Sequence, residues 1–206
     1  KARYGRRTPL LYTGIDTNFY RPINDDCEKE INKQVKILLI GNPQLKFKGF
    51  ELILAVLNKL WLNGYQFQVT WATQVRITID ANFPINILTN ISQTELAELY
   101  RISDIFISGS VYESFSMPPL EAFSSGTAVV STDNGGIHVY AKPGKNILLV
   151  EQGNFADLYA AIAYMIDNPK IRLDMAKNAR DDALKFSVDN AINQLENILY
   201  HIVQNS

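Results

Sequence analysis

Short apolar runs alternate with amphipathic stretches along most of the chain. Most of the runs are apolar at nearly every position, which predicts strands buried on both faces of a sheet. Strands are expected at Val35–Ile40, Phe67–Trp71, Pro84–Leu88, Asp104–Ser108, Thr127–Ser131 and Ile147–Val150. Elsewhere, apolar residues recur at intervals of three and four, which predicts helices. Helices are expected at about Phe50–Leu62, Thr94–Arg101, Pro118–Ser125, Phe155–Asp167, Pro169–Lys185 and Val188–Ile202.

This order of elements predicts an α/β fold, a doubly wound parallel sheet of the Rossmann-like kind with terminal helices. Ser92 and Glu95 have the spacing of a capping box at the start of one of the helices. The stretch around Pro22 is rich in Asn, Asp, Glu and Lys, as is typical of a surface connection. We therefore divide the chain into a leading segment or linker (1–33), an α/β domain (34–187) and a C-terminal helix (188–206).

Composition and charge exclude several classes of function. The chain has 206 residues, 47% of them hydrophobic, with 20 Lys+Arg against 21 Asp+Glu. A formal net charge of -1 gives no field to hold a polyanion, so no nucleic acid is expected as a partner. The one cysteine, Cys27, cannot form an internal disulfide, which favours a reducing, cytoplasmic location. No apolar run reaches the roughly 18 residues that span a bilayer. The chain does not begin with Met, and we expect either a fragment of a longer protein or a processed product.

The chemically distinctive residues lie in loops that follow predicted strands, where open α/β sheets bind ligands. Lys48 precedes a helix start, a place that disfavours a cation unless a phosphate binds there. The alternative is a solvated loop lysine. Gly135 and Gly136 would let backbone N–H groups approach an anion. Asn-Gly-Gly is equally an ordinary tight turn.

The loop after the fourth strand combines a helix start with carboxylates. Pro118 fits a first helical turn, so the N–H groups before it would favour an anion. The alternative is that Ser116 only caps the helix. Glu113 and Glu121 would face one cleft and accept hydrogen bonds from vicinal hydroxyls of a sugar or ribose. Otherwise Glu113 is an exposed loop acid, and Glu121 is favoured by the helix dipole alone.

Other chemistries lack their motifs. His138 and His201 have no sequence-near Cys or His partner, so no metal is expected. The phosphate loop Gly-x-x-x-x-Gly-Lys-[Ser/Thr], the dinucleotide fingerprint Gly-x-Gly-x-x-Gly and the nucleophile elbow Gly-x-Ser-x-Gly are all absent. No cofactor is expected.

The segment Asp104–Val130, centred on Glu113-Ser-Phe-Ser-Met-Pro-Pro-Leu-Glu121, resembles the Glu-x7-Glu signature of retaining glycosyltransferases of the group 1 family, which have the GT-B fold. Further motifs match in the same order along nearly the whole chain: Gly41 with Lys48-Gly49, Asn90-Ile91-Ser92, Gly135-Gly136-Ile137 and Gly144-Lys145-Asn146. The resemblance implies that this chain is the C-terminal, nucleotide-sugar-binding half of such an enzyme, and that the N-terminal acceptor domain is absent from it.

The resemblance also implies roles for single residues. Glu113 and Lys48 would be catalytic, with Glu113 binding hydroxyls of the transferred sugar and Lys48 neutralising the diphosphate. Glu121 would bind the donor ribose, and the backbone at Ile91 would meet the base. The rest of the implied donor site is Asn42, Ser114, Phe115, Ser116 and Met117, with a candidate phosphate loop at Gly41, Lys46, Gly135 and Gly136.

The implied substrate is a nucleoside-diphosphate sugar, bound without a metal. The acceptor is unknown and could be a sugar, a lipid-linked molecule or a protein. Peripheral membrane association would come through the missing N-terminal domain. The chain departs from the family pattern at Asn42, Ser116, His138 and Val139, where Arg, Gly, Pro and Glu are usual. Two alternatives are a non-catalytic nucleotide-sugar-binding module and a nucleotide-sugar epimerase. The isolated chain is expected to bind a donor without transferring sugar.

Overall fold

The computed structural model describes residues 10–24 and 34–204, so Cys27 and most of the leading segment lie outside the described residues. Its strands form one six-stranded sheet in the order β3-β2-β1-β4-β5-β6, with every neighbouring pair parallel. The prediction of a doubly wound parallel sheet is confirmed. The strands are β1 (Val35–Ile40), β2 (Phe67–Thr73), β3 (Ile85–Thr89), β4 (Ile105–Ser108), β5 (Ala128–Thr132) and β6 (Leu148–Val150).

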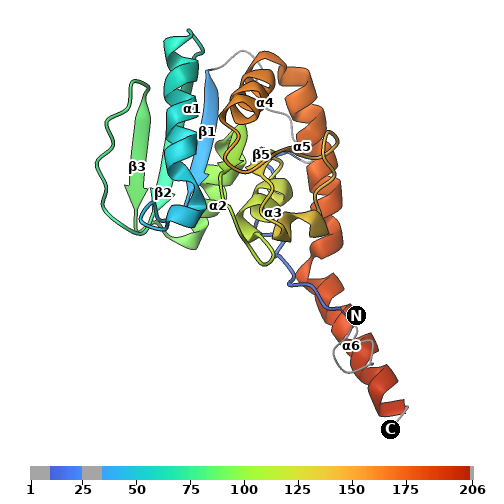
Figure 1. Ribbon diagram of the computed structural model, residues 1–206. Helices are drawn as coiled ribbons and strands as arrows, with labels where there is room; N and C mark the ends of the chain where they lie inside the picture. Colours follow the sequence, from blue (N-terminus) through green and yellow to red (C-terminus); the bar gives the residue numbers. More distant parts are fainter. Residues whose placement is uncertain (1–9, 25–33, 205–206) are drawn as a thin grey trace.

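Helices cover both faces of this sheet (Figure 1). One core cluster joins the sheet to α1 and α4, and a second joins it to α2 and α3, while α5 contributes to both. The predicted capping box is confirmed, because Ser92 and Glu95 exchange hydrogen bonds at the start of α2. The helices are α1 (Phe50–Leu62), α2 (Gln93–Ile102), α3 (Met117–Ser124), α4 (Phe155–Asp167), α5 (Pro169–Ala183) and α6 (Val188–Gln204), with short 3-10 turns η1 (Lys46–Lys48), η2 (Gly136–Val139) and η3 (Leu184–Phe186).

The strand order reverses between β1 and β4, which is the topological switch point of the sheet. From β1 the chain moves outward through β2 to β3, and it then returns to the other side of β1 and moves outward through β4, β5 and β6. The loops after β1 and β4 therefore diverge from adjacent strands. Such a switch point leaves a crevice outside the carboxyl ends of the two strands, where ligands bind in open α/β sheets.

The leading segment is more than a linker. Ile15 forms a bridge with Ser187 and is 2% exposed, and Tyr20 is 5% exposed. The guanidinium of Arg180 donates to the carbonyl oxygens of Thr17 and Tyr20. Ile15 and Tyr20 pack into the second core cluster, so the described part of the leading segment is in contact with the body of the domain.

Helix α6 extends away from the body of the molecule (Figure 1). None of its described side chains is buried. Its apolar residues recur along one side of the helix and are exposed: Val188, Ile192, Leu195, Leu199 and Ile202.

Candidate functional site

Two glycines hold the loops after β1 and β4 together at the switch point. A Cβ on Gly49 would lie 2.0 Å from the carbonyl oxygen of Gly109, so only glycine permits this approach. Gly49 also has a φ of 67°, in the left-handed region that glycine adopts without strain. A few residues away, the N–H of Val111 donates to the carbonyl of Phe47 at 2.7 Å. The backbone itself therefore fixes the distance between the two loops.

This contact brings the two predicted catalytic side chains together. Lys48 Nζ lies 2.6 Å from Glu113 Oε1, and the hydroxyl of Ser110 donates to the same oxygen at 3.0 Å. The two charged side chains are about one-fifth exposed, at 21% and 20%. Lys48 lies next to Gly49, the N-cap of α1, where the helix dipole disfavours a cation. The Glu113 carboxylate supplies the negative charge that compensates for this position.

Helix α3 begins at the same pocket. Ser116 is the N-cap, and Pro118 and Pro119 follow Met117 in the first turn. Prolines have no N–H, so the N-terminal donors of this helix are reduced to those of Ser116 and Met117. The lining of the pocket includes Lys48, Glu113 and Ser116. One ammonium group, one carboxylate and the start of a helix thus surround one small volume at the carboxyl ends of β1 and β4.

Ser116 is held in an unusual backbone conformation. Its φ of 63° and ψ of 66° are left-handed, which costs a non-glycine residue about 1–2 kcal/mol. Its side chain makes no capping hydrogen bond, so the predicted capping role of its hydroxyl is not observed. Asn134 Nδ2 instead donates to Ser116 Oγ at 3.1 Å, and the Tyr140 hydroxyl donates to the Ser116 carbonyl at 2.5 Å. These two contacts stabilise the bend from which α3 starts.

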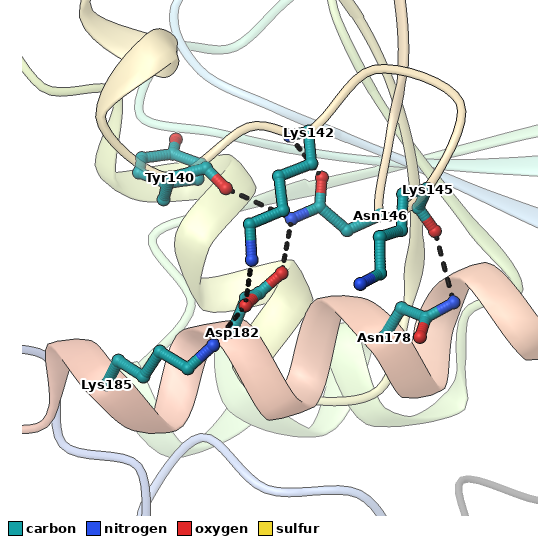
Figure 2. Close-up of polar contacts among 7 residues, drawn as sticks. All are labelled: Tyr140, Lys142, Lys145, Asn146, Asn178, Asp182 and Lys185. Atoms are coloured by element: carbon teal, nitrogen blue, oxygen red, sulfur yellow. Dashed lines mark hydrogen bonds and ion pairs between the residues drawn. The ribbon is translucent and has the colours of Figure 1, made fainter.

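Tyr140 is itself anchored by a polar network on α5 (Figure 2). Asn146 donates to the Tyr140 carbonyl and to Asp182 Oδ2, each at 3.0 Å. Lys142 and Lys185 donate to Asp182 Oδ1 at 2.5 and 2.6 Å. Burial opposes ionisation of Asp182, but these hydrogen bonds outweigh it and hold the pKa of that carboxyl below its usual value. A charged, 7% exposed carboxylate therefore ties the loop that carries Tyr140 to the core.

Glu121 lies in a different environment from Glu113. The hydroxyl of Tyr100 donates to Glu121 Oε2 at 2.8 Å, and the Tyr20 hydroxyl also acts on this carboxyl and lowers its pKa. Burial raises the pKa of the Glu121 carboxyl, and the two hydroxyl donors only partly offset that rise. Among the described residues, the lining of the pocket around Lys48 includes Glu113 but not Glu121. The two carboxylates do not both line this small pocket, and that they face one larger cleft stays a prediction.

Several other predicted residues already have partners. The N–H of Gly41 donates to the Ala72 carbonyl, and Asn42 Oδ1 accepts from the N–H of Gln44. The N–H groups of Gly135 and Gly136 donate to Asp133 Oδ1 and the Asn134 carbonyl. The structure therefore favours the turn interpretation of Gly135 and Gly136 over the phosphate-binding one.

Gly136 also has a packing role. A Cβ there would lie 2.5 Å from the carbonyl oxygen of Glu113, so this glycine lets the two loops touch. Phe115 is partly buried in an aromatic cluster and lies 5.8 Å from Tyr140 and 6.0 Å from Tyr12, measured between ring centroids. Ser114 and Lys46 are exposed, and Ile91 is partly exposed in the loop after β3.

Reasoning from the sequence missed the residues that support the site: Gly109, Ser110, Asn134 and Tyr140. A glycine directly after a strand is a signal for close backbone approach, and Gly109 has that position. The contacts of Asn134 and Tyr140 with Ser116 span 18 and 24 residues and leave no local pattern in the sequence. Among the described non-glycine residues, only Asn90 and Ser116 have positive φ, and both lie in loops at the carboxyl edge of the sheet. Strained backbone of this kind concentrates at functional sites.

Within residues 10–24 and 34–204, no cluster of His, Cys, Asp and Glu side chains is arranged to hold a metal ion. No helix in those ranges combines the length and apolarity needed to cross a membrane.

Comparison with known proteins adds independent support for the class of protein. Residues 81–182 match the family model described as glycosyl transferases group 1. A D-inositol 3-phosphate glycosyltransferase from Corynebacterium aurimucosum is 27% identical over 92% of this chain. The match covers 50% of that relative, so this chain spans about half of its length.

Solved structures share the fold. The C-terminal domain of a group 1 family glycosyl transferase from Francisella tularensis is matched over 85% of this chain and 100% of that chain, with a TM-score of 0.71 and 21% identity. Anabaena HepE, in complex with UDP-glucose, is matched over 97% of this chain and 59% of its own, with a TM-score of 0.76 and 18% identity. The six-stranded parallel sheet flanked by helices is the Rossmann-like fold of GT-B glycosyltransferase structures. The chain belongs to the group 1 glycosyltransferase family, and its fold is that of the family's C-terminal domain.

Proposed function

We propose that this chain is the donor-binding domain of a retaining glycosyltransferase that uses a nucleoside-diphosphate sugar. The observation that carries the proposal is the convergence of Lys48, Glu113 and the N-terminus of α3 on one pocket at the switch point of the sheet. The UDP-glucose complex of HepE, which has a similar fold, supports a donor of this class.

Each group in the pocket has a distinct task in this proposal. The Lys48 ammonium and the N–H groups of Ser116 and Met117 stabilise the diphosphate, on which negative charge develops as the glycosidic bond breaks. Glu113 accepts hydrogen bonds from hydroxyls of the transferred sugar and orients it. Retention then follows from attack on the face that the leaving phosphate occupies, assisted by that phosphate. A dedicated general base and a metal ion are not required.

The nucleoside lies beyond the diphosphate. Glu121 accepts hydrogen bonds from the ribose, and the backbone at Ile91 contacts the base. Lys46 is exposed in η1, and it assists Lys48 with the phosphates where the family usually has Arg in place of Asn42. Tyr100 and Tyr20 orient the Glu121 carboxylate for this role.

Transfer requires more than this chain in our proposal. The chain spans about half of the Corynebacterium relative, and the acceptor is bound by the part of the enzyme that this chain does not include. The acceptor class, whether sugar, lipid-linked molecule or protein, is set there, as is any peripheral attachment to a membrane. We place the protein in the cytoplasm, where nucleotide sugars are available without having to be exported. We also propose that the isolated chain binds the donor but transfers no sugar.

Calorimetric titration with UDP, GDP and their sugars tests the proposal. We expect saturable binding of at least one nucleoside diphosphate and its sugar. Absence of binding to all of them at millimolar concentration would remove the proposed function.

A non-catalytic nucleotide-sugar-binding module is the second candidate. Val139, which stands where the family usually has Glu, packs partly buried against the second core cluster and offers no carboxylate to a ligand. This alternative predicts that the complete protein, supplied with donor and a suitable acceptor, binds the donor without turnover. Product formation under those conditions would eliminate it.

A further inference from the structure

We propose that Glu113 competes with the donor diphosphate for Lys48, so that the site retains a sugar-bearing nucleotide and releases the bare nucleoside diphosphate. This inference rests on the proposed function, and it concerns how the same pocket distinguishes donor from product. The two partners in the competition are both negative and both interact with one ammonium group.

The geometry gives Glu113 a strong hold on Lys48. The distance of 2.6 Å between Lys48 Nζ and Glu113 Oε1 is that of a charge-assisted hydrogen bond, and both side chains are largely shielded from water. The pair has no net charge. A diphosphate that enters the pocket therefore meets a lysine whose charge is already compensated by Glu113. The attraction of the diphosphate to the pocket is reduced until Glu113 turns away.

A sugar supplies the means to turn Glu113 away. Among the described residues, the two partners of this carboxylate, Lys48 and Ser110, both contact Oε1. Oε2 is the oxygen that can accept from a sugar hydroxyl. When a hydroxyl binds the carboxylate, it replaces part of the stabilisation that Lys48 provides, and Lys48 is free to turn to the phosphates. A nucleoside diphosphate without a sugar offers no such replacement.

The loops leave the exchange to the side chains. The contact between Gly49 and Gly109 and the hydrogen bond from Val111 to Phe47 hold the two loop backbones against each other. Lys48 Nζ lies 5.5 Å from the centre of the Phe47 ring, within the range of a cation–π interaction. This interaction favours an ammonium group at the pocket. Rotation of the Lys48 and Glu113 side chains is sufficient to pass the ammonium from carboxylate to phosphate. After sugar transfer, the same rotation in reverse displaces the product.

The variant Glu113→Gln tests this competition, because it keeps the size of the side chain and removes its charge. We expect UDP or GDP to bind this variant about fivefold more tightly than the unchanged chain, which corresponds to the upper range for a partly exposed ion pair. Affinity for the corresponding nucleotide sugar should stay equal or fall. Equal or weaker binding of the bare diphosphate to the variant would overturn the inference.

A matched control is Glu98→Gln, which removes a carboxylate paired with Arg101 on α2 at 2.9 Å. It should leave both affinities unchanged. The double variant Lys48→Ala with Glu113→Gln should lose the gain, because no cation remains to be released. Circular dichroism establishes that each variant is folded, and Glu113→Ala replaces Glu113→Gln if the latter is not.

Inorganic pyrophosphate separates failure of this inference from failure of the proposed function. If no nucleotide binds any of these proteins, the proposed function has failed, and pyrophosphate alone then decides the competition. Tighter pyrophosphate binding by Glu113→Gln supports the competition, and unchanged binding contradicts it.

NMR resonances of the lysine side-chain nitrogens provide a readout that needs no ligand. Removal of the Glu113 charge should shift the Lys48 signal, and an unshifted signal would show that the ion pair does not form.

Discussion

The surroundings of Glu113 and Glu121 differ in the way each carboxylate is compensated. Glu113 lies in a loop, and the Lys48 ammonium is 2.6 Å from its carboxylate. Glu121 lies on α3, and its neighbours are the hydroxyls of Tyr100 and Tyr20. A cation can be exchanged for another partner without loss of fold, so Glu113 is suited to a step in which partners change. Neutral hydroxyls only partly offset the effect of burial on Glu121. The ionised Glu121 carboxylate therefore lowers the free energy of unfolding. One glutamate is placed to switch and the other to stay fixed.

The largest expected effect comes from removing the cation of Glu113. Lys48→Ala should weaken binding of UDP or GDP about thirtyfold, the loss of one charge-assisted hydrogen bond of about 2 kcal/mol. Calorimetric titration measures it, and Lys59→Ala, which removes an exposed lysine in the last turn of α1, is the matched control. Unchanged affinity in Lys48→Ala would remove this lysine from the site.

The second effect concerns the hydroxyl above Glu121. Tyr100 has no exposed surface, so Tyr100→Phe leaves a partly buried carboxylate with one donor fewer and should lower the free energy of unfolding by about 1–2 kcal/mol. The corresponding change beside Glu113, Ser110→Ala, should cost less than about 0.5 kcal/mol because Lys48 still compensates that carboxylate. Urea unfolding compares the two. Equal losses would erase the distinction between the two glutamates.

A third prediction uses the raised pKa of the Glu121 carboxyl. Burial is its main cause, and a raised folded-state pKa means that the contribution of this group to stability is complete below the usual value of 4.5 and is lost as pH rises through the folded-state value. Glu121→Gln carries no such penalty. It should be more stable than the unchanged chain at pH 7, by less than about 1 kcal/mol, and should lose that advantage near pH 4. Urea unfolding at both pH values measures this, and a deficit of the same size at both would contradict it.

The smallest expected effect lies between the two glutamates, at Ser116. Ser116→Gly relieves the left-handed backbone by about 1 kcal/mol but removes the hydrogen bond from Asn134, worth about the same. The net change in the free energy of unfolding should stay within about 0.5 kcal/mol. Ser116→Ala, which loses the hydrogen bond and keeps the Cβ, is the matched control and should be destabilised by about 1 kcal/mol. A large gain in the glycine variant would show that the hydroxyl contact contributes little.

The elements of the fold were predictable because they depend on local pattern. The bounds of β1 and α1 agree with the structure to the residue, since each is a strong apolar pattern. Gly41 directly follows β1, and Gly49 and Asn63 flank α1. The extension of β2 to Thr73 was not predicted. Ala72 and Thr73 pair with Leu88 and Thr89 on β3, and a pairing of that kind is not encoded in β2 alone.

The charged residues of the candidate site could be predicted from the sequence, but the residues that contact and position them could not. Lys48 and Glu113 stand out in the sequence because each lies in a loop that follows a predicted strand and precedes a predicted helix. The partners of Glu121 could not be foreseen, because Tyr20 is brought to it by the packing of a segment about a hundred positions earlier in the chain. The Asp182 network that anchors Tyr140 is equally non-local, since α5 meets the loop only in the folded molecule (Figure 2).

The contact between Gly49 and Gly109 has a consequence for protein engineering. Since backbone atoms alone set the distance between the two loops, side chains around it can be varied without moving the walls of the pocket. A combinatorial library aimed at altered donor preference is best built by randomising Lys46, Phe47, Val111 and Tyr112. The two glycines must be held constant in every member, because a methyl group at either one separates the loops before any new side chain can be judged.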